Sequence, residues 1–356
     1  MCVVSDSQNW TTRRLLSWIR GHLEERGVDA PRVSAEMLVS AAIGAERLRL
    51  YMEPDRVASQ GERDILRDWI RRAGDHEPIQ YLVGEAWFHG LRIEVDASTL
   101  IPRPSSETLV ETAATLVSEL GRPPRILEPC AGTGCVGIAL LRLLDRPHRA
   151  AARMREADAA IQADLERLVL AVDERADPPG ETGRTPATGG GDDESDPSTL
   201  RVFTGELATL VATELVPEAA TLARRNLERH HLGDRAEVRV GSLFEPLAPD
   251  EQGTFDLVVA NPPYVSDAEY AECPKNVRDF EPATALRGGA DGLEVIRPLV
   301  ARAANWLRPG GGIAIEMQYD HAEAARDVLG GAGFEGIEVR RDADDQERVI
   351  SGRRPG

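Results

Sequence analysis

The tetrapeptide Asn261-Pro262-Pro263-Tyr264 has the residue types in this chain best suited to gripping a flat polar group. It follows an apolar, β-branched run at 255–260, the pattern of a fully buried strand. Pro262 has no N–H for a sheet and restricts the preceding residue to extended conformations, so Asn261 is held at the mouth of this strand. The amide oxygen of Asn261 can accept a hydrogen bond from an NH₂ group, a neighbouring carbonyl can accept the second hydrogen, and Tyr264 can cover the plane. The alternative is a proline-rich turn that only ends a core strand.

A second candidate is the segment 125–137, where a predicted strand runs into a glycine-containing turn and then a helix. Glycines allow the backbone to approach a ligand, and the N–H groups that open a helix favour negatively charged groups. Gly132, Gly134 and Gly137 have the spacing of the dinucleotide-binding pattern GxGxxG, which is a weak signal without wider context. From these residues alone, a structural turn and a nucleotide site remain open in equal measure.

The acidic partner expected for such a site falls unusually late in the chain. A carboxylate that binds ribose hydroxyls commonly ends the second strand, about 20 residues after the glycine turn. Here residues 146–205 intervene, and their stretch 177–199 is rich in Pro, Gly, Thr, Asp and Glu, a composition that cannot bury a core. We therefore interpret 146–205 as an insertion, partly disordered. The ribose carboxylate is then Glu214, where the next predicted strand ends.

The remainder of the chain alternates between strand and helix. Strands are predicted at 236–240, 255–260, 312–317, 336–340 and 346–351, and helices at 291–307 and 321–331. This alternation predicts a doubly wound, mostly parallel α/β sheet, in which ligands bind beyond the carboxyl ends of the strands. Four candidate residues fall at such ends and should line one site: Glu128, Glu214, Leu243 and Asn261.

Prolines and glycines divide the part of the chain that precedes this sheet. Residues 1–76 show helical periodicity at 10–27, 32–43 and 61–73 and contain no cluster of chemically active side chains. We interpret them as a small helical recognition domain. Residues 77–104 form a linker with two short strands around Gly90, the pattern of a hairpin, and residues 105–356 form the sheet domain.

Composition indicates a cytoplasmic protein that neither enters a membrane nor binds nucleic acid directly. No apolar run approaches the length of a membrane span, and the N-terminus lacks the pattern of a signal peptide. The four cysteines show neither CxxC spacing nor a disulfide framework. The net charge of −18 disfavours nonspecific contact with nucleic acid, because Lys and Arg must neutralise phosphates. We find no cluster that predicts a metal site.

Several motifs together resemble those of the HemK-like peptide-chain release factor N5-glutamine methyltransferases. They are residues 78–84, residues 100–104 with Glu107, the glycine turn, the Asn-Pro-Pro-Tyr tetrapeptide, and parts of 281–293. The resemblance covers nearly the whole chain apart from the insertion. It implies a Rossmann-like class I methyltransferase fold with S-adenosylmethionine as cofactor. The implied substrate is the glutamine side-chain amide in the Gly-Gly-Gln loop of class I release factors.

The resemblance also implies roles for individual residues. Those implied to bind the cofactor are Glu128, Cys130, Ala131, Gly132, Thr133, Gly134, Glu214, Leu243 and Asn261. Within this set, 130–134 would cradle the methionine part, Glu214 would bind the ribose and Leu243 would lie along the adenine. The glutamine amide would be held by Asn261, Pro262, Pro263 and Tyr264. Because a sulfonium methyl is already activated, catalysis would depend on positioning and on acceptors that strengthen as the nitrogen becomes positive.

The chain departs from the family's usual residues at several positions: Ser105, Ser106, Glu128, Pro129, Cys130, Ala131 and Ser242. Two of these, Cys130 and Ala131, alter the glycine turn, so a cofactor-binding scaffold without turnover remains an alternative. A further alternative is an amino-methyltransferase that acts on adenine or guanine flipped out of a nucleic acid. That activity would require a basic groove or a separate target-recognition domain.

Overall fold

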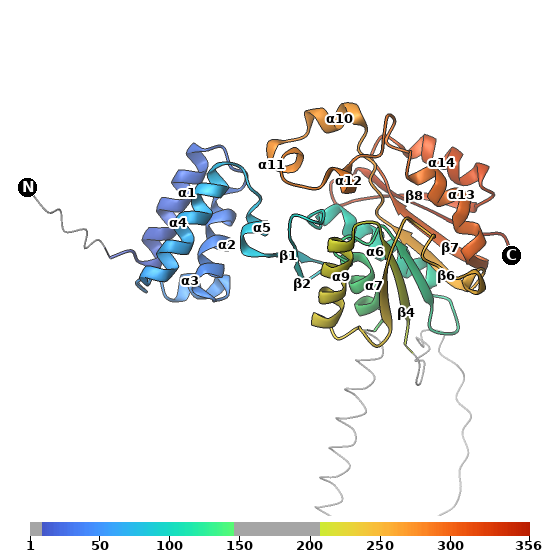
Figure 1. Ribbon diagram of the computed structural model, residues 1–356, viewed down its shortest axis with the longest axis horizontal. Helices are drawn as coiled ribbons and strands as arrows, with labels where there is room; N and C mark the ends of the chain where they lie inside the picture. The colour runs from blue at the N-terminus through green and yellow to red at the C-terminus, as the bar shows by residue number, and fades with distance from the viewer. Residues whose placement is uncertain (1–8, 146–206) are drawn as a thin grey trace, which may run out of the picture.

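The computed structural model describes residues 9–145 and 207–356, which form a helical bundle followed by an α/β sheet (Figure 1). The predicted insertion at 146–205 lies outside the described residues. None of the described helices is both long and apolar enough to cross a lipid bilayer.

The N-terminal bundle contains the helices α1 (Thr12–Glu25), α2 (Pro31–Ile43), α3 (Arg47–Met52), α4 (Gln60–Gly74) and α5 (Ile79–Val83). The predictions for α1, α2 and α4 are confirmed, whereas the short helices α3 and α5 were not expected. Side-chain caps fix two of the starts, since Thr11 accepts from Arg14 N–H and Ser59 forms a capping box with Glu62. The apolar faces of these helices meet in one core around Ile19, which is fully buried.

The predicted hairpin joins the bundle to the sheet. Strands β1 (Glu85–Phe88) and β2 (Leu91–Glu94) pair antiparallel, and His89 and Gly90 connect them with φ of 50° and 75°. Both connecting residues therefore have the left-handed conformation that a two-residue hairpin turn requires. The hairpin is fixed to the sheet domain by buried Asn226, whose amide bonds both the N–H and the carbonyl of Glu94 at 2.8 and 3.0 Å.

The main sheet has seven strands in the order β5-β4-β3-β6-β7-β9-β8. Their bounds are β3 (Arg125–Pro129), β4 (Thr209–Glu214), β5 (Ala236–Val240), β6 (Phe255–Ala260), β7 (Leu307–Glu316), β8 (Glu335–Arg341) and β9 (Glu347–Arg353). The strands from β5 to β7 are parallel, and β9 runs antiparallel to both β7 and β8. The prediction of a doubly wound, mostly parallel sheet is confirmed.

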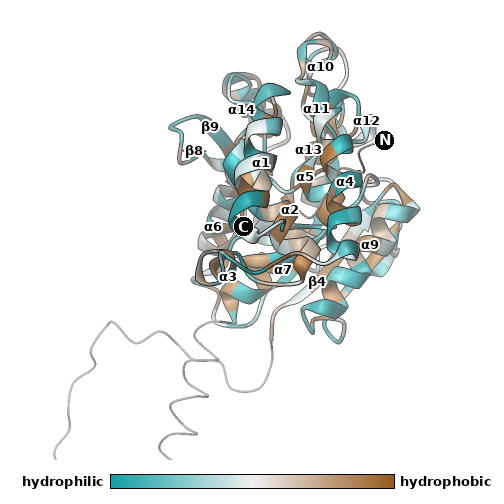
Figure 2. Cartoon of the chain, turned by 90° about the vertical axis from the view of Figure 1, so that its left-hand side faces the viewer, coloured by the Kyte–Doolittle hydropathy of each residue, from teal (hydrophilic) through white to brown (hydrophobic). Residues whose placement is uncertain are grey.

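Helices cover both faces of this sheet. Apolar residues of α6 (Glu107–Val117), α7 (Cys135–Leu144) and α9 (Pro217–Arg229) share one core with one sheet face. Those of α13 (Ile296–Trp306) and α14 (Ala322–Gly331) share the second core with the opposite face. Hydropathy follows this packing, because α7 is largely brown in Figure 2 whereas the outward sides of α4 and α9 are largely teal.

Three short helices lie beyond the carboxyl ends of the strands at the top of Figure 1 and were not predicted. They are α10 (Asp267–Glu272), α11 (Lys275–Arg278) and α12 (Ala283–Leu286). Two predicted starts were also wrong. The helix expected from 291 begins at Ile296, and the strand expected from 312 begins at Leu307 because a bulge opposite Phe255 accommodates its proline and glycines.

The two ends of the undescribed segment are held by one guanidinium. Arg235 forms an ion pair with the buried carboxylate of Asp145, after α7, and donates to the carbonyl of Ala208, before β4, at 3.2 Å. Helix α7 starts beside the glycine turn and β4 ends at Glu214, so the far ends of both elements lie at the amino edge of the sheet. The segment 146–206 therefore connects to the fold at the edge opposite the predicted site.

Candidate functional site

A cavity of about 430 Å³ lies at the carboxyl edge of the parallel strands, within the size range of small-molecule sites. The expected residues that line it are Glu128, Cys130, Ala131, Gly132, Thr133, Glu214, Leu243, Asn261 and Pro263. Gly134, Pro262 and Tyr264 do not line it. The prediction that four strand ends meet at one edge is confirmed, because the ends of β3, β4 and β6 and the loop after β5 all contribute.

The glycine turn is a series of left-handed residues. Cys130, Gly132 and Gly134 have φ of 60°, 54° and 74°. Cys130 therefore takes a conformation that glycine adopts freely but that strains other residues. Gly134 closes the turn through its N–H to the Ala131 carbonyl at 2.7 Å and then caps α7, which explains why it lies behind the cavity wall.

Glu128 is a buried carboxyl group with one oxygen left over. Its Oε1 accepts from the N–H of Gly137 at 3.1 Å, whereas Oε2 has no hydrogen-bond partner among the described residues. Burial raises its pKa to about 8, and the charge of Glu214 adds to this effect. A Cβ on Gly137 would lie 2.2 Å from Oε2, so only glycine fits there. Glu128 therefore lines the cavity, but its unpartnered oxygen is buried against Gly137.

Glu214 links the glycine turn to the end of β4. Its Oε2 accepts from the N–H of Gly132 at 2.8 Å and its Oε1 from the N–H of Val216 at 2.9 Å. Each oxygen keeps a second lone pair, and the side chain lines the cavity. The carboxylate is therefore held in a fixed orientation while still able to accept from a pair of hydroxyl groups.

Leu243 forms the neighbouring wall in a strained conformation, with φ of 48°. The Thr213 hydroxyl donates to the Leu243 carbonyl at 2.6 Å and thereby fixes the loop after β5 to β4. An apolar side chain held in this way beside Glu214 is suited to cover a flat ring.

The two cysteines of the turn behave as packing residues. Burial raises the pKa of both Cys130 and Cys135 to about 12, and the charge of Glu128 raises both further. Both thiols are therefore protonated at neutral pH, whereas a thiolate would be required for nucleophilic or metal chemistry. Among the residues that the structure describes, no group of three or more His, Cys, Asp or Glu side chains is placed to hold a metal ion.

Asn261 stands directly beyond β6, half-buried at the mouth of the cavity. Its Nδ2 donates to the Ser106 hydroxyl at 3.2 Å, a bond between residues 155 positions apart. Tyr264 points elsewhere: its hydroxyl donates to Glu316 Oε1 at 2.9 Å, and its ring packs against the second core. The structure thus brings Asn261 and Pro263 to the cavity and places Tyr264 behind them as an anchor.

The loop that contains Asn261 is held from behind by a glycine-rich segment. Val265 pairs with this segment through Val265 N–H to the Leu286 carbonyl at 2.9 Å and Gly288 N–H to the Val265 carbonyl at 2.8 Å. A Cβ on Gly292 would lie 2.4 Å from the Tyr264 carbonyl, so a larger residue cannot enter. This close packing explains why glycine is required at 288 and 292.

The opposite wall consists of residues that sequence reasoning did not assign to the site. They include Ser98, Thr99, Leu100, Pro102, Arg103, Ser106, Thr284, Ala285 and Arg287. Buried Glu281 fixes this wall, since it accepts from the N–H of Ile101 at 3.1 Å and forms an ion pair with Arg103. The motifs at 100–104 and 281–282 were the available signal, although the sequence alone does not show that they contact each other.

The cavity suits a cationic nucleoside. Two carboxyl groups, Glu128 and Glu214, reach it from the strand ends, and an amide and a leucine flank them. Carboxyl groups favour positive charge nearby, and Glu214 offers acceptors for hydroxyls. The residues present therefore fit S-adenosylmethionine, a cationic nucleoside.

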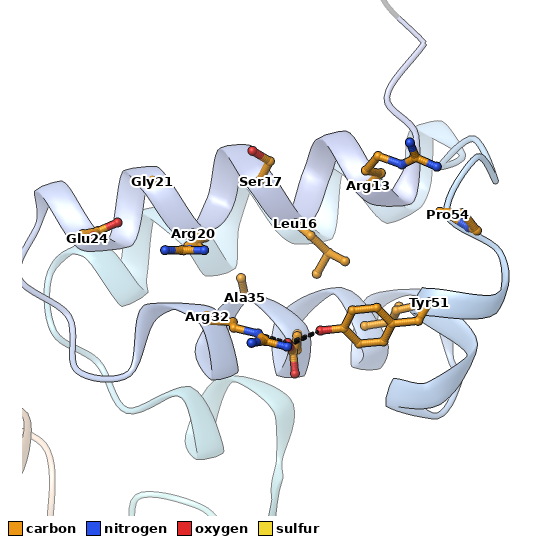
Figure 3. A pocket seen from close by; sticks show the side chains of 12 residues that line it. Arg13, Leu16, Ser17, Arg20, Gly21, Glu24, Arg32, Ala35, Tyr51 and Pro54 are labelled. Carbon is orange, nitrogen blue, oxygen red and sulfur yellow. Dashed lines mark hydrogen bonds and ion pairs between the residues drawn. The ribbon is translucent and has the colours of Figure 1, made fainter.

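A second cavity, of about 490 Å³, lies in the N-terminal bundle between α1 and the α2–α3 pair. Figure 3 shows Leu16 and Arg20 of α1 on one side and Arg32 and Tyr51 on the other. Arg32 is oriented by Tyr51, at 3.2 Å, and by Glu36, at 3.0 Å. Its lining contains three arginines and two glutamates beside Leu16, Leu50 and Tyr51.

Comparison with known proteins identifies the family. A family described as the PrmC N-terminal domain matches residues 14–84. The chain is similar to a release factor glutamine methyltransferase of Geobacter sulfurreducens, at 33% identity over 97% of each chain. It is also similar to one of Mycolicibacterium smegmatis, at 31% identity over 93% of this chain and 94% of the relative.

Solved structures show a more distant likeness. They include a ribosomal protein L11 methylase from Lactobacillus delbrueckii subsp. bulgaricus, at 13% identity and a TM-score of 0.40, which covers 74% of this chain and 86% of the other. A methyltransferase from Pyrococcus furiosus has 16% identity and a TM-score of 0.39, over 75% and 90% of the two chains. The sheet domain itself has a Rossmann-like, doubly wound fold in which β9 runs antiparallel between β7 and β8. On the near full-length similarity to its relatives, the chain belongs to the family of release factor glutamine methyltransferases.

Proposed function

We propose that this protein transfers a methyl group from S-adenosylmethionine to the side-chain amide nitrogen of the glutamine in the Gly-Gly-Gln loop of class I release factors. The observation that carries the proposal is the position of Asn261, whose amide stands at the mouth of a cavity with carboxyl groups at its other strand ends. The family membership supports the same activity.

The protein's task in this reaction is to hold and orient a weak nucleophile. The bound cofactor would supply an electrophilic methyl group on a sulfonium, which leaves as a neutral thioether. Asn261 Oδ1 would accept one hydrogen of the substrate NH₂ group, and the Pro262 carbonyl would accept the other. Both hydrogen bonds strengthen as positive charge develops on the nitrogen, which loses one proton after the new C–N bond forms.

The cofactor would be held by the turn and the strand ends. Glu214 would accept from the ribose hydroxyls, Leu243 would cover the adenine, and residues 130–134 would surround the methionine part. Glu128, which also lines the cavity, would turn its carboxyl group to accept from the ammonium group. The charge of Glu214 favours a cationic ligand, and Glu128, whose pKa burial raises to about 8, would lose its proton when that ligand binds.

The helical bundle is the proposed recognition domain for the protein substrate, with its boundary near residue 76. Its cavity is lined by Arg20, which has no ion pair within the described residues, and, at its other end, by exposed Tyr51. Substituting Glu for Arg20 should raise KM for the release factor several-fold while kcat and cofactor affinity stay unchanged. Arg63→Glu on α4, a partly exposed arginine outside this cavity, is the control.

The decisive experiment is transfer of labelled methyl from S-adenosylmethionine to purified release factor. The expected result is label on the release factor, lost when the glutamine of the Gly-Gly-Gln loop is changed to alanine. DNA and RNA serve as parallel substrates, and comparable labelling of either would replace the proposal with a nucleic-acid amino-methyltransferase. Cofactor binding without label on any substrate would leave a scaffold without turnover.

A further inference from the structure

Glu316 is a buried carboxylate beside the site that the proposed chemistry does not use. It ends β7 and is 0% exposed. Strands β6 and β7 are parallel with Ala260 opposite Ile315, so the next residues, Asn261 and Glu316, lie side by side. Alternation along each strand turns both side chains to the sheet face that α6 covers. Ser106 precedes α6 on that face and is also buried.

Two hydroxyl groups approach the Glu316 carboxylate. The Tyr264 hydroxyl donates to Oε1 at 2.9 Å. Burial raises the pKa of Glu316, and the hydroxyls of Ser106 and Tyr264 and the charge of Arg348 act against that rise. The other oxygen, Oε2, is buried and accepts no hydrogen bond from a described residue, so a relay from Glu316 through Ser106 to Asn261 adds one contact to the structure, the bond from the Ser106 hydroxyl to Oε2. The hydroxyls and the charge of Arg348 thus favour the carboxylate form of Glu316, and burial and the charge of Asp342 oppose it.

Ser106 can determine how the Asn261 amide is oriented because it has only one hydroxyl hydrogen to donate. When that hydrogen is directed at Glu316, Ser106 has only lone pairs for its other neighbour, Asn261. Asn261 must then turn its NH₂ group to Ser106, as it does at 3.2 Å, and its oxygen to the cavity. A reversed amide would present a donor to the substrate NH₂ group, which is itself a donor.

We propose that Glu316, acting through the Ser106 hydroxyl, fixes the Asn261 amide with its oxygen towards the substrate. Glu316 and Ser106 are then positioning residues, and Asn261 is the residue that contacts the substrate. The role in methyl transfer rests on the proposed function, whereas the orientation of the amide does not. Glu316 has a second effect on the same loop, because it also anchors Tyr264.

The kinetic test compares Ser106→Ala, Ser106→Thr and Glu316→Gln. Loss of one positioning contact should lower kcat about 10- to 100-fold in Ser106→Ala, with the cofactor dissociation constant within about two-fold. Ser106→Thr keeps a hydroxyl and should recover most of the turnover. Glu316→Gln can donate to Ser106 and reverse the relay, so it should lose kcat to a similar extent. Because both residues act through one chain of bonds, the double variant should lose little more than the worse single variant.

A matched control separates positioning from general damage. Asp256 is a buried carboxylate at the amino end of β6, bonded to Arg122 and to the N–H of Arg125, far along the same strand from Asn261. Asp256→Asn should lower the melting temperature without lowering kcat. If Glu316→Gln lowers kcat no more than Asp256→Asn does, Glu316 is only structural and the proposal fails.

A second readout needs no substrate. In protein labelled with ¹⁵N at asparagine, the Asn261 side-chain NH₂ should exchange slowly with solvent while it is bonded to Ser106. Exchange should accelerate in Ser106→Ala and Glu316→Gln and stay slow in Ser106→Thr and Asp256→Asn. Unchanged exchange in Ser106→Ala would overturn the relay. If the unmodified protein fails to label release factor, the proposed function fails, and this measurement still decides the amide orientation.

Discussion

Replacing Glu128 with glutamine should stabilise the ligand-free protein at pH 8 and destabilise it at pH 5. Burial raises the pKa of this carboxyl group from 4.5 to about 8. Between these values the folded protein keeps a proton that the unfolded chain has lost. The free energy of unfolding therefore falls as pH rises through this window. Below the lower value both states are protonated, and the group contributes no pH dependence.

The size of the effect follows from the width of this window. One pKa unit corresponds to about 1.4 kcal/mol, so the rise from 4.5 to about 8 corresponds to roughly 4–5 kcal/mol lost by pH 8. Glutamine cannot ionise and escapes this loss. It keeps an acceptor for Gly137 N–H but leaves a buried NH₂ group without a partner, a cost of about 1–3 kcal/mol at every pH. The diagnostic quantity is therefore the change in ΔΔG between pH 5 and pH 8.

The assay is denaturant unfolding of both proteins at several pH values from 5 to 8. Glu251→Gln is the matched control, because Glu251 is a buried carboxylate whose pKa Arg239 and the Ala248 N–H hold below its usual value against the effect of burial. Its loss should cost the same stability at every pH in this range, because its pKa is 4.5 or lower in both the unfolded and the folded state. A Glu128→Gln effect equal at pH 5 and pH 8 would refute a raised pKa. Calorimetry in two buffers should also detect proton release from Glu128 when the cationic cofactor binds.

Three further predictions concern the site and the chain around it. Glu214→Ala should weaken cofactor binding by about 1.5–3 kcal/mol in calorimetry, because it removes charge-assisted hydrogen bonds, and an unchanged dissociation constant would place the ribose elsewhere. Asn261→Ala should lower kcat by about 10²–10³ with the cofactor still bound, and Asn261→Asp should be slow but less so. If Asn261→Ala keeps most of its turnover, the tetrapeptide is only a turn. Replacing residues 150–203 with a short Gly/Ser linker should keep methyl transfer within a few-fold, because the described ends lie opposite the cavity, and a folded but inactive deletion would contradict this.

The strands were predictable wherever the signal is local. β5 and β6 occupy the predicted residues, because each is an apolar run ended by Gly241 or Pro262. The start of β7 was not predictable, since Pro309 and the glycines after it have the composition of a turn but lie in a bulged strand. The helices α10–α12 were missed because four to six residues show too little periodicity.

The site was predictable in outline from topology alone. Parallel strands bring their carboxyl ends to one edge, so Glu128, Glu214 and Asn261 had to meet there. The bonds that orient them were not predictable, because Ser106 and Asn261 are separated by 155 positions. Tyr264 was expected to cover the substrate amide, and only the structure shows its hydroxyl on Glu316.

The two contacts of the Arg235 guanidinium have a consequence for how this protein can change over evolution. One guanidinium holds Asp145 and the Ala208 carbonyl, so the fold constrains where this part of the chain leaves and returns. Lengthening a closed loop costs only about 0.6 kcal/mol for each doubling of its length. Whole modules with adjacent termini could therefore be acquired, exchanged or lost here in single genetic events. The same position offers a graft point for a fluorescent or affinity domain that leaves both termini free.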